Sequence, residues 1–254
     1  MALPSREALR RIAVAFRRLV GDTKATSRKM TSNWRSCIAL ALVVSGFGRT
    51  SAIAQQSPSP GELAVALQKK YDGVATFSTD FTHEHEGGVL RRKLVEQGSL
   101  QVKKPGRMRW DYKSPEKKLF VSDGTTIYFH DITNNQVTVS QMPQGDDVSS
   151  AALFLLGKGD LARDFTPSFG TGGVPDTYVL RLVPKREQAD YDWLELTVDR
   201  KTLQLRGLTA AEKQGGRTTF VFTNFKENVN LADRTFVFRI PPGAEVIHAG
   251  RTKG

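Results

Sequence analysis

Apolar and polar side chains alternate along most of the chain after residue 76, and this alternation constrains the fold more than any other feature. Phe77, Thr79 and Phe81 fall on one face of the first such segment, and Met108 and Trp110 fall on one face of a later one. A period of two residues is typical of strands with one buried face. About ten such segments, without regular alternation with helices, predict an α+β, mostly β fold: one strongly curved antiparallel sheet that forms an open, unclosed β-barrel. The last five strands are expected at residues 178–183, 193–198, 203–208, 218–225 and 235–240.

Two helical segments are expected beside these strands. Ser59 and Glu62 have the spacing of a capping box with Pro60 at the first helical position, and Gly73 can end the helix. The apolar side chains of this helix lie on one stripe, formed by Leu63, Leu67 and Tyr71. A second helix is expected at residues 149–157, with a short continuation at 160–165.

The basic charge of the chain is concentrated in its first 54 residues. The formal net charge is +11, from 37 Lys/Arg and 26 Asp/Glu residues, but residues 1–54 contain ten of the basic and only two of the acidic residues. Residues 55–254 therefore carry a net charge of only +3. A part so nearly balanced has no polyanion-binding character, so nucleic acid is not an expected partner.

The first 54 residues have the layout of an export leader. A basic stretch precedes an apolar run at residues 37–48, and Ala52-Ile53-Ala54 supplies a small-x-small cleavage pattern. Twelve apolar residues are too few to span a bilayer as a helix. We predict a true start at Met30, cleavage after Ala54 and a periplasmic protein with one domain over 55–254. Its single cysteine, Cys37, lies in the leader, so the mature chain has no disulfide.

The chain carries no familiar catalytic motif: it has no G-x-S-x-G, no H-E-x-x-H and no Walker loop. The sequence therefore predicts neither an enzyme nor a cofactor. His83 and His85 share a strand face and are the best candidates for a metal site. A polar strand end that enters a turn at Gly87-Gly88 explains them more simply, and the metal-dependent periplasmic enzyme is kept as a minor alternative.

Aromatic residues are concentrated on the alternating strand positions. They suit either a closed core between sheet and helices or a concave face too large for the helices to fill, which would leave an apolar cavity. Composition does not choose between these two interpretations. The residues in question are Phe77, Phe81, Trp110, Phe129, Phe220, Phe222, Phe236 and Phe238.

Two segments resemble motifs of the LolA family, the periplasmic carriers that move lipoproteins from the inner to the outer membrane. Residues 98–112 read GSLQVKKPGRMRWDY, close to the family pattern G-x-L-x-V-K-R-P-x-x-F-R-W-x-Y, and residues 120–131 read FVSDGTTIYFHD, close to V-S-D-G-x-x-L-W-x-Y. The segments LFLLG at 153–157 and FVFRIPPG at 236–243 also fit. The resemblance therefore extends, in order, over essentially the whole chain after the leader.

This resemblance implies helices that form a lid over an apolar cavity for the acyl chains of a lipoprotein. Lys104 stands where the family usually has an arginine that holds the lid shut through lid carbonyls, and it is expected to reach those of residues 153–157. An ammonium lacks the rigid fork of a guanidinium, so the gate is expected to differ. The side chains expected to line the cavity are Phe77, Phe81, Leu100, Met108, Trp110, Ile127, Phe129, Leu153, Leu156, Phe220 and Phe222.

The expected function is that of a periplasmic chaperone that carries lipoproteins to the outer membrane as a monomer. Its expected partners are the lipoproteins, an inner-membrane ABC-type releasing complex and an outer-membrane receptor or the membrane itself. The ATPase must be a separate protein because this chain has no nucleotide-binding motif. An envelope-stress sensor on the same fold, which binds mislocalised lipoproteins, is the alternative from another class. Such sensors usually carry an additional C-terminal domain, and the chain ends about a dozen residues after Pro242, which disfavours it.

Overall fold

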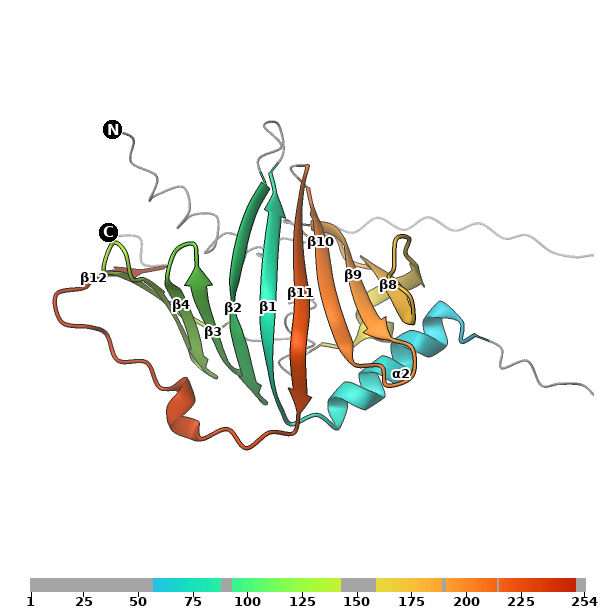
Figure 1. Ribbon diagram of the computed structural model, residues 1–254, viewed down its shortest axis with the longest axis horizontal. Helices are drawn as coiled ribbons and strands as arrows, with labels where there is room; N and C mark the ends of the chain where they lie inside the picture. Colours follow the sequence, from blue (N-terminus) through green and yellow to red (C-terminus); the bar gives the residue numbers. More distant parts are fainter. Residues whose placement is uncertain (1–56, 88–92, 143–158, 189–190, 214, 250–254) are drawn as a thin grey trace, which may run out of the picture.

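The structure is a computed structural model that describes residues 57–87, 93–142, 159–188, 191–213 and 215–249. It consists of one large curved sheet with few helices (Figure 1), which confirms the predicted mostly-β, unclosed fold. The strands are β1 Thr76–Glu86, β2 Lys93–Lys103, β3 Arg107–Ser114, β4 Lys118–Asp123, β5 Thr126–Asp131, β6 Gln136–Gln141, β7 Phe165–Phe169, β8 Thr177–Pro184, β9 Tyr191–Asp199, β10 Leu205–Glu212, β11 Gly216–Glu227 and β12 Glu245–His248.

The strands form one sheet in the order β12-β6-β5-β4-β3-β2-β1-β11-β10-β9-β8-β7. Two meanders, β2–β6 and β7–β10, flank a central pair in which β1 runs antiparallel to β11. The exception to antiparallel pairing is β12, which runs parallel to β6 at the far edge. Two of the hairpin turns contain a residue in the left-handed conformation: Asn135 (φ 47°) between β5 and β6, and Gly215 (φ 79°) between β10 and β11.

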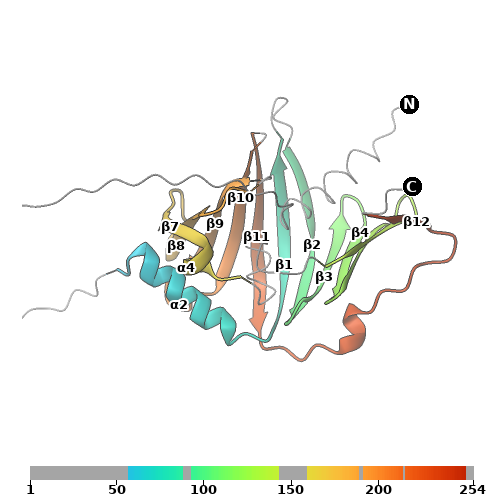
Figure 2. The ribbon, with the colours of Figure 1, turned by 180° about the vertical axis from the view of Figure 1, so that it is seen from behind.

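Helix α2 (Pro60–Asp72) forms as its sequence predicts. The Ser59 hydroxyl accepts from the backbone of Glu62, the Glu62 carboxylate accepts from the backbone of Ser59 at 2.8 Å, and Gly73 is the C-cap. Its apolar stripe, Leu63, Leu67 and Tyr71, is buried. Helix α2 lies over the β7–β8 side of the sheet (Figure 2), so it defines an inner face and an opposite, outer face.

The second predicted helix, at residues 149–157, lies outside the described residues. Its expected continuation at 160–165 is α4 (Leu161–Asp164), in which the Asp160 side chain accepts from the backbone of Ala162 and Arg163. Phe165 already belongs to β7, so the expected helical stretch is one residue too long.

The strand expected at 235–240 is wrong. A short 3-10 helix, η1 (Asp233–Phe236), takes its place and is followed by extended chain without a strand partner until β12 (Figure 1). Apolar and polar residues alternate in this segment because it lies across the outer face of the sheet. The Phe238 ring packs on Tyr128, with ring centroids 5.2 Å apart, and on His130, with ring centroids 5.8 Å apart. We call residues 231–244 the outer strap. It buries Phe236 to 1% exposure.

Candidate functional site

The inner face of the sheet carries the side chains that were predicted to line a cavity. All of those within the described residues are at most 7% exposed except Trp110, which is half-buried. They belong to or pack against one apolar cluster: Phe77, Phe81, Leu100, Met108, Trp110, Ile127, Phe129, Phe220 and Phe222. Leu153 and Leu156 lie outside the described residues.

Strand register explains why these side chains meet. Phe81 pairs across the sheet with Phe222, and Leu100 pairs with Trp110, so side chains of the same phase stand side by side. Phe81, Trp110 and Phe220 form an aromatic triangle with ring centroids 5.1 to 5.9 Å apart. Such tilted and edge-on contacts are favourable beyond the area that they bury.

Gly98 makes room for this triangle. A Cβ atom at this position would lie 2.6 Å from Cζ of Phe81, its cross-strand neighbour. Only a residue without a side chain allows the Phe81 ring to cross over β2. The glycine that opens the first motif is therefore required by packing on the inner face.

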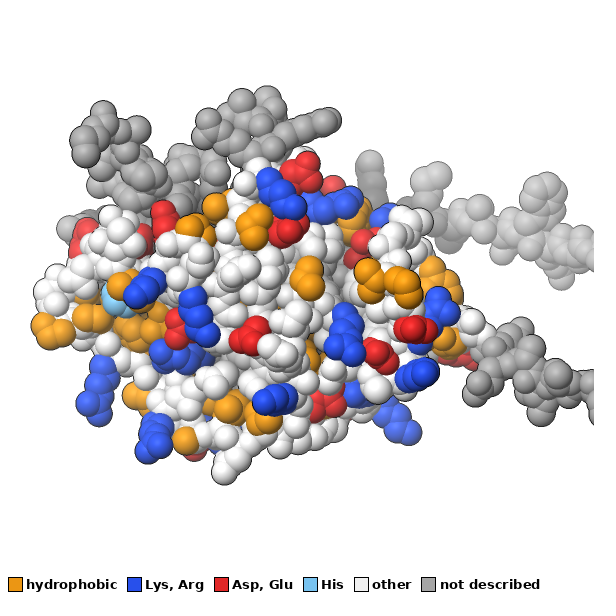
Figure 3. Space-filling view, in the orientation of Figure 1, with side chains coloured by type: hydrophobic (Ala, Val, Ile, Leu, Met, Phe, Trp, Pro, Cys, Tyr) orange, Lys and Arg blue, Asp and Glu red, His pale blue; other side chains and the backbone are white. Residues whose placement is uncertain are grey.

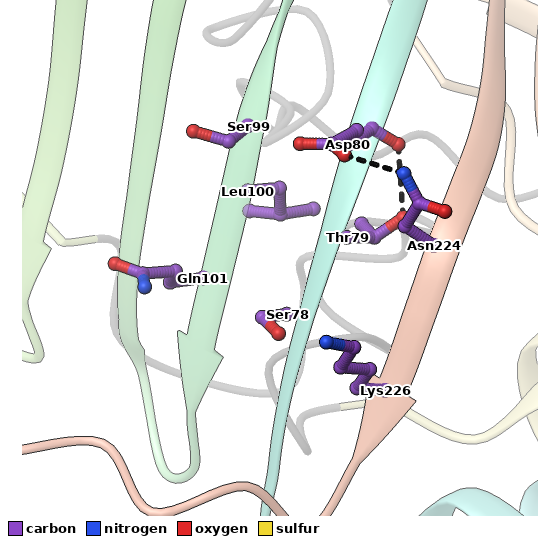
Figure 4. A pocket seen from close by; sticks show the side chains of 8 residues that line it. All are labelled: Ser78, Thr79, Asp80, Ser99, Leu100, Gln101, Asn224 and Lys226. Atoms are coloured by element: carbon purple, nitrogen blue, oxygen red, sulfur yellow. Dashed lines mark hydrogen bonds between the residues drawn. The ribbon is translucent and has the colours of Figure 1, made fainter.

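One hollow in the described part of the chain lies apart from the packed inner face. It measures about 350 Å³, lies over β1, β2 and β11, and has a mostly polar lining (Figure 4). The Asn224 side-chain amide donates to the Asp80 carboxylate at 2.8 Å within it. Leu100 is the one predicted cavity residue among its lining residues, which are Ser78, Thr79, Asp80, Ser99, Leu100, Gln101, Asn224 and Lys226. Its chemistry does not suit acyl chains.

Lys104, the predicted gate residue, contacts the end of α2. Its Nζ donates to the backbone carbonyl of Tyr71 in the last helical turn and lies 5.9 Å from the centre of the Tyr71 ring. The Lys104 backbone N–H also donates to Ala75 at 2.9 Å. The expected contact with the carbonyls of 153–157 falls outside the described residues.

The electrostatics of this contact suit a holding role. The C-terminus of a helix carries partial negative charge, which a cation stabilises. Burial lowers the pKa of Lys104, and the nearby Asp72 carboxylate counteracts that shift. Tyr71 anchors the same turn on its other side, because its hydroxyl accepts the backbone N–H of Leu205 at 2.8 Å. Lys104 and Tyr71 together fasten α2 to the sheet.

The structure also contains a buried polar group, of which only His83 was a candidate site residue from the sequence. His83 Nδ1 lies 3.1 Å from one Glu96 carboxylate oxygen, and Lys118 Nζ lies 2.7 Å from the other. The three side chains are 7%, 2% and 4% exposed, respectively. One sequence feature does indicate them: Glu96 and Lys118 occupy the apolar phase of their strands, in line with Gly98 and Phe120.

These contacts place the two candidate metal ligands in different surroundings. His83 pairs with Glu96, whereas His85 Nδ1 lies 3.1 Å from the Thr218 hydroxyl and 3.4 Å from the Glu212 carboxylate. Across the described ranges, no three His, Cys, Asp or Glu side chains come together as a metal site would require.

The pKa shifts in this group follow from its pairing. Burial raises the pKa of Glu96, but the hydrogen bonds from His83 and Lys118 outweigh burial and leave it below its usual value. Burial lowers the pKa of Lys118, but the Glu96 and Glu116 carboxylates have the larger effect and leave this pKa above its usual value. Glu96 and Lys118 are therefore both ionised at neutral pH.

The surface shows acidic and basic side chains interspersed (Figure 3). Several ion pairs connect them, such as Lys103 and Arg107 with Asp233 of the outer strap, at 2.6 and 2.7 Å. Within the described part of the chain, no helix has both the length and the apolar character needed to cross a bilayer.

Comparison with known proteins identifies the family. Residues 72–239 match the family model described as outer membrane lipoprotein carrier protein LolA. The outer-membrane lipoprotein carrier protein of Methylococcus capsulatus is 28% identical over 84% of this chain and 97% of its own length. That of Actinobacillus succinogenes is 30% identical over 72% of this chain and 85% of its own length.

Solved structures include a LolA superfamily protein, NE2245 from Nitrosomonas europaea, which aligns with a TM-score of 0.38 and 12% identity over 69% of this chain and 97% of that one. The family model spans more than half of the sequence, and its match includes both motifs at residues 98–112 and 120–131. The chain therefore belongs to the LolA family.

Proposed function

We propose that this protein is a periplasmic carrier that binds the acyl chains of lipoproteins and delivers them to the outer membrane. The observation that carries the proposal is the family membership, together with an inner face made of aromatic, Met and Leu side chains. Relatives with this name match the chain over most of their length. Met108 and the aromatic rings suit acyl chains because they are large, apolar and, in the case of Met, adaptable.

Binding requires the inner face to open. The predicted lining residues are packed against one another, so acyl chains can enter only if α2 or another covering element moves. The contact of Lys104 with the Tyr71 carbonyl is the proposed gate, because it joins α2 to the turn between β2 and β3. Opening breaks this contact, and closing restores it.

The energetics favour a carrier that buries its cargo only in part. Three acyl chains contain roughly 45 methylenes, worth about 0.8 kcal/mol each, or about 36 kcal/mol gross. Noncovalent affinities reach a limit near about 20 kcal/mol. The cost of opening the inner face lowers the net affinity, so an acceptor with a better apolar site can take the lipid without ATP.

Loading needs energy from elsewhere, because the cargo must leave a membrane. We assign that step to an inner-membrane ABC-type complex and the release step to an outer-membrane receptor or the membrane itself. The leader, with cleavage after Ala54, would bring residues 55–254 to the periplasm as one domain. The proposal includes no reaction and no cofactor.

The test is the capture of lipoproteins by the protein purified from periplasm, identified by mass spectrometry together with the mature N-terminus. Met108→Glu places a carboxylate on the inner face, at a cost of several kcal/mol to acyl binding if it stays charged. Val221→Glu is the matched control, because Val221 is 46% exposed on the outer phase of β11.

We expect native protein and Val221→Glu to retain lipoproteins, and Met108→Glu to fold but lose them. Equal retention by both variants would remove the inner face as the binding site. Native protein that carries no lipoprotein would contradict the carrier function. Native protein that begins at Met1 or Met30 would contradict the export step.

A further inference from the structure

Three buried side chains form a continuous polar line across the inner face. His83 on β1 contacts Glu96 on β2, and Glu96 contacts Lys118 on β4. The line passes Tyr112 on β3, which is the cross-strand partner of Lys118. The ring centroid of Tyr112 lies 6.0 Å from that of His83. We call His83, Glu96 and Lys118 the polar bar.

The polar bar is costly as a purely structural feature. Removing two charges from water is expensive, and apolar replacements of a buried ion pair are often neutral or stabilising. Here the pair lies among aromatic rings: the His83 ring stacks on Phe220 with centroids 4.2 Å apart. A buried charged group beside an apolar binding surface is a candidate for ligand recognition.

The position of the polar bar along the strands fits the length of an acyl chain. Phe77 lies near the start of β1, next to the end of α2, and His83 lies six residues further along the strand. At about 3.3 Å per residue this is about 20 Å. One leaflet of a bilayer has about 15 Å of hydrocarbon, so an acyl chain of this length fits between the end of α2 and the bar without reaching Phe77. An acyl chain with its tail toward α2 would thus bring its polar end to the bar.

The chemistry of the bar suits a carbonyl group. A lysine ammonium has three N–H donors, and the Glu96 and Glu116 carboxylates, at 2.7 and 3.2 Å, engage two of them. The third can serve a ligand acceptor. Because ionised Glu96 only accepts, the His83 ring donates to it through Nδ1. The bar thus offers one charged donor, Lys118, within an apolar surface.

We propose that Lys118, positioned by Glu96 and His83, binds the ester carbonyl that joins the acyl chains to the cargo's glycerol group. This inference rests on the proposed function and deepens it. Acyl esters occur both in the diacylglyceryl group of lipoproteins and in phospholipids, so the ester carbonyl is the shared chemistry. Hydrocarbon alone lacks this group, so the bar distinguishes a lipid from other apolar matter.

The test compares ligands that differ only in that carbonyl. A synthetic lipopeptide with two ester-linked acyl chains on glyceryl-cysteine is titrated against the full mature protein, beside its ether-linked analogue. A phosphatidylcholine with the same ester-linked chains forms the third arm, and displacement of an apolar dye reports binding. The variant Glu96→Gln/Lys118→Met removes both charges together, so that neither is left unpaired in the interior.

We expect the native protein to bind the diester lipopeptide about tenfold to a hundredfold more tightly than the diether, the range for one hydrogen bond to a charged group. The double variant should bind both at the level of the diether. Tight binding of the phosphatidylcholine would support recognition of the ester alone. Tight binding of the lipopeptide only would support recognition of the ester together with the cysteinyl group, which the phosphatidylcholine lacks.

Equal binding of diester and diether by the native protein would overturn the inference, and this ratio needs no variant to fold. Full ester preference in the double variant would overturn it as well. In both cases, binding of the lipopeptide would still support the proposed carrier function. Failure to bind either lipopeptide would overturn the carrier function and this inference together.

Discussion

The two flanks of the sheet are covered on opposite faces. On the β7–β10 flank, α2 and α4 cover the inner face (Figure 2). On the β2–β6 flank, the outer strap covers the outer face, where Val121 and Val137 are fully buried. The first flank packs aliphatic side chains under a helix: Leu180, Leu182, Leu194, Leu196, Val198 and Leu205, all at 0% exposure.

This difference means that the side chains that mainly stabilise the sheet and those proposed to bind lipid lie in different parts of it. Among the described residues, the aliphatic flank buries its inner side chains under α2. The other flank gains part of its burial from the outer strap, so its stability depends less on what its inner face contacts. The inner face of this flank and of the adjoining central pair, β1 and β11, carries Met108, the aromatic triangle and the polar bar. Substitutions on the two flanks should therefore have different consequences.

The largest effect is expected for the polar bar. Glu96→Leu leaves Lys118 buried without its main carboxylate, and breaking a buried pair costs about 3–5 kcal/mol. The Glu96→Gln/Lys118→Met variant should lose much less, since no charge is left alone. Urea denaturation of both variants measures the free energies of unfolding. Equal losses would mean that the pair itself stabilises the flank.

The same pair predicts an acid sensitivity. The folded-state pKa of Glu96 is lowered, so its contribution to stability is complete above the ordinary carboxyl pKa of about 4.3. It is lost as the pH falls through the lower pKa of the folded state. Native protein should lose more stability than Glu96→Leu over this acid range, measured as the melting temperature at each pH. Parallel pH profiles would contradict the prediction.

The next effect concerns the aliphatic flank. Leu67 of α2 is fully buried, and Leu67→Ala should cost about 2–5 kcal/mol of unfolding free energy. Val65→Ala, on the exposed side of the same helix at 56% exposure, should change it by no more than about 0.5 kcal/mol. A small loss from Leu67→Ala would break the comparison, because α2 would then not be the permanent cover of this flank.

A smaller effect is expected at the gate between the flanks. Lys104→Leu removes a hydrogen bond from a charged group to the Tyr71 carbonyl, worth about 1.5–3 kcal/mol. The variant should bind more apolar dye and transfer less cargo to an acceptor membrane, whereas Lys104→Arg should retain the closed state. Native-like behaviour of Lys104→Leu in both assays would leave α2 held by packing alone.

The smallest effect concerns the start of α2. Ser59→Ala removes the capping hydroxyl and should cost about 1 kcal/mol. Ser57→Ala, in the exposed chain before the helix, should have no measurable effect on the unfolding transition. If α2 also moves in the opening step, Ser59→Ala should increase dye binding slightly. No change in dye binding would confine the cap to a role in stability.

Local chemistry made much of the fold predictable. The capping box at Ser59 and Glu62, the buried stripe at Leu63 and Leu67, and the strand phases that bury Phe81 and Met108 all follow from neighbours in sequence. These features depend on periods and caps, which the sequence displays directly.

Long-range partners were not predictable in the same way. Alternation at residues 235–240 indicated a strand, but such alternation arises whenever one side of an extended segment packs on a surface, as Phe236 and Phe238 do. Lys118 and Glu96 occupy apolar phases, yet only the strand order β4-β3-β2 brings their charges together. The Tyr71 carbonyl became a partner of Lys104 because the β2–β3 turn meets the end of α2.

The pairing of β1 with β11 determines when the sheet can be completed during folding. Thr79 and Thr223, joined by a hydrogen bond across this pair, are 144 residues apart in sequence. Contacts of such separation form slowly, because the entropy of closing the loop must be overcome first. The central seam cannot form until almost the whole chain is available. Under the proposed export, in which the chain crosses a membrane before it folds, this topology would delay completion of the sheet until translocation is nearly over.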